Sequence, residues 1–183
     1  MQEQHLAARI AREQDDVILV CEHDPVYTIG RKRGASVNVL SAGDVPVVDV
    51  SRGGDVTFHG PGQVVAYPIV ALSEAERDLH AFMHRLEQVM IEVCATFELP
   101  AGRDDRNTGA WVRGRKVGSV GIACRRWVTW HGIALNVTTD LSWFERINPC
   151  GFSSSIMTSM ATERPGIAFP EVNGRVREAF LRW

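Results

Sequence analysis

Long apolar runs are missing from this sequence of 183 residues. The longest, Val64 to Leu72, has nine residues and contains Pro68, whereas a helix needs about 20 apolar residues to span a membrane. The N-terminal stretch MQEQHLAARIAREQDD also lacks the apolar centre of a secretory signal. We therefore expect neither a membrane span nor a signal peptide, and we predict a cytoplasmic protein.

A large net charge is missing too. Twenty basic residues against 22 acidic ones leave a net charge of -2, which gives no general attraction to nucleic acid or to a membrane surface. A protein partner or a small molecule is the better expectation. Lysine is the scarcest charged residue, with only Lys32 and Lys116 present. Since lysine, unlike arginine, readily gives up its proton, each of the two is a candidate for proton transfer.

Paired cysteine motifs are absent. The four cysteines, Cys21, Cys94, Cys124 and Cys150, form no CxxC pair, so reduced thiols are predicted rather than a disulfide framework. Cys21 and Cys94 lie in apolar periodic segments and are interpreted as core residues. Cys124 ends a strand and fits either a core or a chemical role.

Cys150 has different surroundings. It lies in INPCGF, between Pro149 and Gly151, in an irregular stretch of the kind where catalytic groups occur. Gly151 leaves room for a substrate carbonyl beside a bare backbone N–H. A thiol with a pKa of about 8.5 still needs a nearby cation or base before it can act as a nucleophile. Position alone therefore makes Cys150 a candidate nucleophile and no more.

Three segments could supply such a partner. His59 and His131 are each followed by glycine, and Lys116 opens the glycine-rich strand KVGSVGIA. Glycines within a strand indicate that another group approaches the backbone closely, or else a β-bulge beside a surface lysine. As zinc ligands, Cys21, His23, His59, His131 and Cys150 lack paired ligand spacing, so no metal site is predicted.

The segment RGGDVTFHGPGQ, residues 52–63, concentrates glycine around a short apolar strand. It lacks the lysine and the following Ser or Thr of a phosphate-binding P-loop, and it has no GxGxxG pattern. Glycines that flank valine and phenylalanine favour an apolar slot lined by backbone.

The order of elements predicts one α+β domain. We expect a helix over 1–12, strands at 17–21, 45–50, 56–58 and 63–70, and a helix over 74–98 that begins at the capping box of Ser73 and Glu76. Further strands are expected at 110–123 and 126–137, with a short helix from Pro170. Residues 22–36 and 101–109 are interpreted as loops. Strands, one long helix and more strands favour a mixed, largely antiparallel sheet with flanking helices.

Four segments in this order and spacing resemble one family. RGGDVTFHGPGQVVAYPI, KVGSVGIA, WHGIALNVTTDL and INPCGF look like those of the octanoyltransferases, which move an octanoyl group from acyl carrier protein to lipoyl domains. EHDPVYTIGR and IMTSM fit as well, so the resemblance runs from about residue 4 to the C-terminus. It implies a single domain over 1–183 with the biotin/lipoate protein ligase fold, without the first strand of the family. Gly118 stands where the family more often has alanine.

The resemblance also implies site residues and partners. The acyl-thioester cysteine falls on Cys150, and the lysine that lowers its pKa falls on Lys116. The implied donor is octanoyl-acyl carrier protein, and the implied acceptors are lipoyl domains of 2-oxoacid dehydrogenases and the glycine cleavage H protein, with no cofactor, ATP or metal. The implied acyl contacts are Arg52, Gly53, Gly54, Asp55, Val56, Thr57, Phe58, His59, Ser119, Val120, Gly121, Gly132, Ile133 and Ala134.

Three other functions remain open at this point. A lipoate or biotin ligase would use ATP and would not need Cys150. A cysteine amidase or thioesterase would use water as the acceptor, and a binding module would need neither Cys150 nor Lys116. The basic residues at 31–33 and 125–126 are candidate contacts for acidic carrier proteins, or else ordinary solvated surface.

Overall fold

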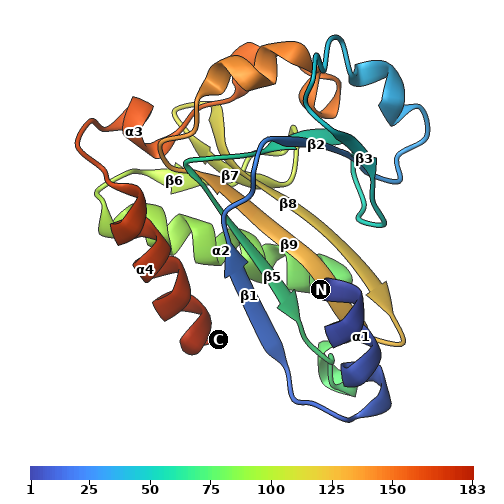
Figure 1. The fold of residues 1–183 in the computed structure, drawn as a ribbon. Helices are drawn as coiled ribbons and strands as arrows, with labels where there is room; N and C mark the ends of the chain where they lie inside the picture. Colours follow the sequence, from blue (N-terminus) through green and yellow to red (C-terminus); the bar gives the residue numbers. More distant parts are fainter.

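The computed structural model describes residues 1–149 and 151–183, so Cys150 lies outside the described residues. Two sheets form the frame (Figure 1). The larger has six strands in the order β1-β5-β9-β8-β7-β6, and each neighbouring pair is antiparallel. Its strands are β1 (Val17–Cys21), β5 (Gln63–Ile69), β6 (Ala101–Gly102), β7 (Gly109–Val112), β8 (Arg115–Arg125) and β9 (Val128–Asn136).

The smaller sheet has the order β3-β2-β4 and lies at the top of Figure 1. It consists of β2 (Val26–Ile29), β3 (Val47–Asp49) and β4 (Val56–His59), with β2 parallel to β3 and antiparallel to β4. The predicted mixed, largely antiparallel arrangement is therefore confirmed.

Four α-helices and five short 3₁₀ turns complete the described residues. The helices are α1 (Gln2–Ala11), α2 (Leu79–Thr96), α3 (Met160–Glu163) and α4 (Phe169–Leu181). The turns are η1 (Ala35–Asn38), η2 (Glu74–Glu76), η3 (Leu141–Arg146), η4 (Pro149–Gly151) and η5 (Ser154–Ile156). Within the described part of the chain, no helix is long and apolar enough to cross a membrane.

Strand alternation places the helices on opposite faces of the large sheet. Side chains at alternate positions of a strand point to opposite faces. On β5, Val64 and Ala66 join the main core under α2 and α4, whereas Ile69 joins a separate cluster with Leu6 of α1. The sheet is thus covered on one face by α2 and α4 and partly on the other by α1. The small sheet lies over the rest of that second face (Figure 1).

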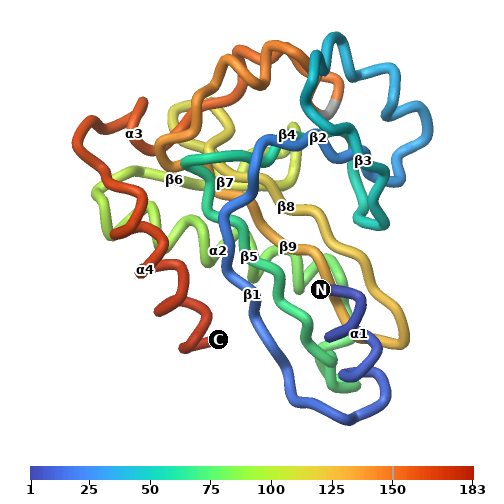
Figure 2. The backbone as a smooth tube through the Cα atoms, viewed as in Figure 1, coloured from blue at the N-terminus to red at the C-terminus, as the bar shows by residue number. Residues whose placement is uncertain are grey.

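The small sheet has an aromatic core of its own. Tyr27 of β2 and Phe58 of β4 are fully buried, and Phe144 of η3 meets the Phe58 ring edge-on at 5.7 Å. The Tyr27 hydroxyl donates to the Trp143 carbonyl at 2.8 Å. These contacts fix the segment that follows β9, orange in Figure 2, against the small sheet.

Four predictions about element boundaries were wrong. Residues 101–109, interpreted as a loop, contain β6 at the start and the first residue of β7 at the end, because Ala101 and Gly102 pair with the end of β7. Residues 22–36 contain β2, because four β-prone residues between proline and glycine are enough to form a strand when their side chains are buried. The predicted strand at 110–123 is the hairpin β7–β8, since Arg113 and Gly114 both have positive φ, as a type I′ turn requires. Glu76 does accept from Ser73, but α2 begins only at Leu79, where Asp78 caps it.

Candidate active site

A cavity of about 470 Å³ lies between the two sheets. This volume is within the range of about 300 to 1,000 Å³ that is usual for small-molecule sites. Of the implied acyl contacts, thirteen line it: Arg52, Gly53, Gly54, Asp55, Val56, Thr57, His59, Ser119, Val120, Gly121, Gly132, Ile133 and Ala134. Phe58 is not among the lining residues. It lies in the aromatic core of the small sheet, with its ring stacked on Trp143 at 5.4 Å.

The same cavity is lined by residues from segments far apart in the chain. Lys116 comes from β8, Asn107 from the loop before β7, and Pro149, Phe152 and Met157 from the stretch around position 150. Cys150 itself lies outside the described residues.

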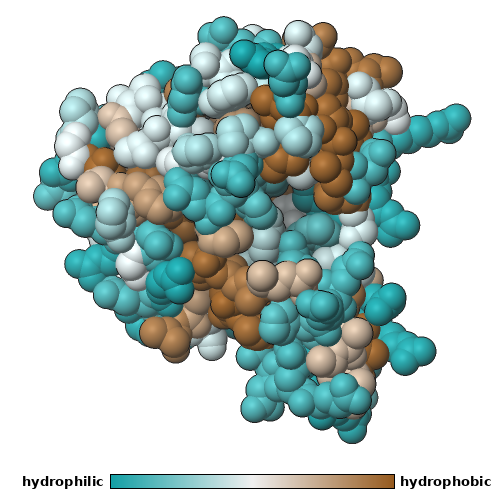
Figure 3. All heavy atoms as spheres, viewed as in Figure 1, coloured by the Kyte–Doolittle hydropathy of each residue, from teal (hydrophilic) through white to brown (hydrophobic). Residues whose placement is uncertain are grey.

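On the surface, apolar side chains gather over η1 and β3 (Figure 3).

Lys116 is a buried lysine. Only 4 % of the residue is exposed, because it lies near the start of β8 and is bridged to Met157 in the segment that follows position 150. Its ammonium donates to the Asn107 side-chain oxygen and lies 5.8 Å from the centre of the Trp111 ring. The Trp111 indole N–H in turn donates to the Asn107 carbonyl at 2.9 Å. Asn107 was missed from the sequence, where it stands in a polar loop with no pattern to mark it.

The glycines beside Lys116 are explained by close contacts. A Cβ on Gly118 would lie 2.5 Å from Met90 Sδ, and one on Gly121 would lie 3.0 Å from Arg52 Cδ. Gly109 has φ +146°, and its Cβ would meet the Gly118 carbonyl oxygen at 2.2 Å. The β7–β8 ladder also shifts register between Ala110 and the next residue. Close approach of other groups thus explains these glycines, and the register shift is the irregularity that a β-bulge would give. Lys116, however, is buried and not a surface lysine.

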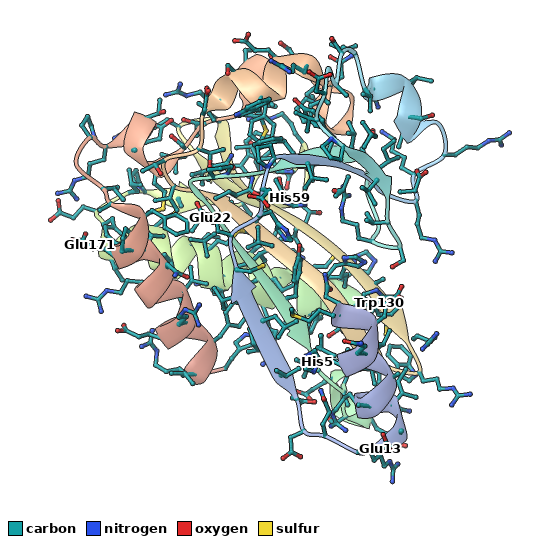
Figure 4. The ribbon with its side chains drawn as sticks, viewed as in Figure 1. His5, Glu13, Glu22, His59, Trp130 and Glu171 are labelled. Carbon is teal, nitrogen blue, oxygen red and sulfur yellow. The ribbon has the colours of Figure 1, made fainter. Side chains whose placement is uncertain are left out.

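An oriented chain of amides fixes the state of His59, which Figure 4 labels between the two sheets. Asn136 Nδ2 donates to the Thr158 carbonyl at 3.0 Å, and Gln63 Nε2 donates to Asn136 Oδ1 at 2.9 Å. Gln63 Oε1 therefore faces His59 Nδ1 at 2.8 Å as an acceptor. This network assigns the proton of His59 to Nδ1. Burial lowers the pKa of His59 to about 3, so the ring is neutral at physiological pH.

Two further histidines line the cavity. His131 Nε2 lies 3.0 Å from Ser51 Oγ, and burial together with the nearby Arg52 lowers the pKa of His131 to about 4. His23 Nε2 lies 2.7 Å from the Tyr67 hydroxyl, and burial lowers the pKa of His23. Among the described residues no three His, Cys, Asp or Glu side chains are grouped so that they could hold a metal ion.

The polar residues of the loop at 52–55 bind the protein itself. The Arg52 guanidinium donates to the Thr28 carbonyl at 2.7 Å and to the Asp55 carbonyl at 2.8 Å, so it ties this loop to β2. The Asp55 carboxylate accepts from Lys32 at 2.8 Å and from Asn38 at 2.9 Å. Burial raises the pKa of Asp55, but the hydrogen bonds from Lys32, Asn38 and the Val56 N–H outweigh it and hold that pKa below its ordinary value.

Comparison with known proteins decides the family. The model of the lipoyl protein ligase A/B catalytic domain matches residues 1–181. The octanoyltransferase of Geobacter metallireducens is 48% identical over 161 residues, which are 88% of this chain and 75% of that protein. The chain belongs to the octanoyltransferase family, a family of acyltransferases.

A second relative and a solved structure agree with this assignment. The octanoyltransferase of Gloeobacter violaceus is 43% identical over 99% of this chain and 82% of that protein. A bipartite lipoate protein ligase of Thermoplasma acidophilum superposes with a TM-score of 0.76 at 14% identity, covering 99% of this chain and 77% of that one. That likeness shows that the octanoyltransferase family and the ligase share a fold.

Proposed function

We propose that this chain transfers an octanoyl group from octanoyl-acyl carrier protein to a lysine of a lipoyl domain, through a thioester on Cys150. The observation that carries the proposal is the burial of Lys116 in the wall of the cavity. Lys116 forms an isolated β-bridge with Met157, and the Thr158 N–H donates to the Lys116 carbonyl at 2.9 Å. The lysine is thus tied to the segment that contains position 150.

The cavity supports an acyl substrate. Valines from the small sheet and Val120, Ile122 and Ile133 from the large sheet give it apolar walls. Burying the methylenes of an eight-carbon chain at about 0.8 kcal/mol each gives about 5 kcal/mol of binding. Backbone N–H groups of the segments that line the cavity are candidates to stabilise the oxyanion that forms on the donor carbonyl.

In the first half-reaction the Lys116 ammonium stabilises the Cys150 thiolate. The sulfur attacks the thioester carbonyl of the donor, so that a new C–S bond forms and the C–S bond to the phosphopantetheine arm breaks. The leaving thiolate takes its proton from the Lys116 ammonium. The enzyme then carries an octanoyl thioester beside a neutral lysine.

In the second half-reaction the acceptor lysine must first lose a proton, because its pKa of about 10.4 keeps it charged. Neutral Lys116 takes that proton as general base. The amine attacks the Cys150 thioester, the C–N bond forms, the C–S bond breaks, and the nitrogen releases its second proton to solvent. Cys150 returns to a thiolate and Lys116 to an ammonium, and neither ATP nor a metal is required.

Intact mass spectrometry tests the proposal. After incubation with octanoyl-acyl carrier protein, the full chain should gain one octanoyl group, and addition of an apo-lipoyl domain should remove it. Cys150→Ala should carry none, and Lys116→Ala should be acylated and deacylated far more slowly. Labelling that requires ATP and survives Cys150→Ala would instead support a ligase. Release of free octanoate with no transfer would support a thioesterase.

A further inference from the structure

The segment at 148–158, which contains position 150, is held at its two ends. At the first end the Asn148 N–H donates to the Asn38 carbonyl at 2.8 Å. At the second end the Thr158 N–H donates to the Lys116 carbonyl at 2.9 Å. Between these ends, the backbone hydrogen bonds of the described residues close local turns, such as that from the Gly151 N–H to the Asn148 carbonyl at 3.0 Å. Its backbone hydrogen bonds to the rest of the protein are therefore made at the two ends, and Met157 adds a buried contact with the core of the small sheet.

The first anchor leads to Asp55. The Asp55 side chain is fully buried, and both of its oxygens lie 2.9 Å from Asn38 Nδ2. The carboxylate also accepts from the Val56 N–H and from Lys32, each at 2.8 Å. Asn38 thus joins the loop at 52–55 to the segment, because its side-chain amide donates to Asp55 and its carbonyl accepts from the Asn148 N–H.

The second anchor leads to Glu163. Its side chain is 1% exposed and accepts from Arg113 at 3.0 Å and from Arg115 at 2.7 Å. The Thr158 hydroxyl donates to the same carboxylate at 2.8 Å. Arg115 directly precedes Lys116, so Glu163 binds the end of the segment and the start of β8 at once.

We propose that Asp55 and Glu163 are positioning residues, each of which fixes one end of segment 148–158 and so sets its place relative to Lys116. Asp55 was implied as an acyl contact, and this assignment gives it a different task. The inference rests on the proposed function for the role of Cys150. An amide in place of either carboxylate removes the charge and brings an N–H against donors, so the anchor loosens while the side-chain volume stays the same.

Alkylation of Cys150 by iodoacetamide against pH tests this without any acyl chemistry. The full chain is used, and Cys150→Ala measures the background from the other cysteines. Asp55→Asn and Glu163→Gln should each raise the midpoint of thiolate formation by about one pH unit, since the segment that contains position 150 is no longer held at a fixed place relative to the Lys116 ammonium. In single-turnover acyl transfer, the rate should fall by about 100-fold, with the KM for the donor within twofold of wild type.

Leu86→Ala is the matched control for lost stability, because Leu86 is buried in the main core under α2. Its midpoint should equal that of the wild type. A shift in Leu86→Ala as large as that in Asp55→Asn would overturn the proposal, as would wild-type midpoints in both carboxylate variants.

Two milder variants serve if a carboxylate variant does not fold. Asn38→Leu removes only the amide that Asp55 binds, and Thr158→Val removes only the hydroxyl that Glu163 binds. Smaller shifts in the same direction support the proposal, and wild-type midpoints in both overturn it. If Cys150→Ala retained transfer, the proposed function would fail, while the alkylation midpoints would still decide the role of the two carboxylates.

Discussion

His59 should make the folded protein sensitive to acid. Burial lowers its pKa from the ordinary 6.5 to about 3, whereas the unfolded chain keeps the ordinary value. Between these values the unfolded state binds a proton that the folded state does not, so stability falls as the pH falls. At pH 4 the unfolded-state pKa lies about 2.5 units above the pH. At about 1.4 kcal/mol per unit, the free energy of unfolding is therefore lower by about 3 kcal/mol than at pH 7.

Urea unfolding followed by tryptophan fluorescence at pH 7 and pH 4 measures this loss. In His59→Gln the loss between the two pH values should be smaller than in wild type by about 3 kcal/mol. His80→Gln, at an exposed position on α2, is the control and should lose as much as the wild type. Burial also lowers the pKa values of His23 and His131, so both add to the loss of stability at pH 4, and they do so in all three proteins. An equal loss in wild type and His59→Gln would refute the reasoning.

Three further substitutions have expected outcomes. Gly118→Ala should cost about 1 kcal/mol in urea unfolding and keep its transfer activity, because the contact at 2.5 Å is with the flexible Met90 sulfur. Gly109→Ala should cost at least about 3 kcal/mol and lose activity, since its Cβ meets backbone at 2.2 Å and Lys116 Cε at 2.7 Å. Leu86→Ala should cost about 2 to 5 kcal/mol, with activity per folded molecule unchanged.

The fold could be predicted where periodic patterns are long. The apolar face of α2 was evident from its repeat, because burial of one face forces a fixed spacing of apolar residues. Strands were also predicted where β8 and β9 lie, although β7 was merged with β8. The small sheet was recognised only in part. Its strands have three or four residues each, and β2 is bounded by proline and glycine, so its formation depends on side chains such as Tyr27 and Phe58 meeting in the fold.

The candidate site, too, could be predicted only in part from the sequence. Lys116 could be singled out because lysine is rare in this chain and because glycines surround it. Asn107, Asn38 and Glu163 could not, since each is an ordinary polar residue whose role arises from a partner distant in sequence. Phe58 shows the reverse error. It lies within a motif that lines the cavity, yet its ring packs in the aromatic core of the small sheet.

The bond between Asn38 and Asn148 has a consequence for synthesis of the protein. The two residues are separated by more than half of the chain, and α4, which covers the main core, follows both. Contacts of this sequence separation form late in folding, because the entropy of closing a long loop must be met first. A chain growing from the ribosome therefore completes its local hairpins well before it can bring the residues around position 150 to Lys116. The approach of these two segments, on which the proposed mechanism depends, is therefore expected among the late steps of folding.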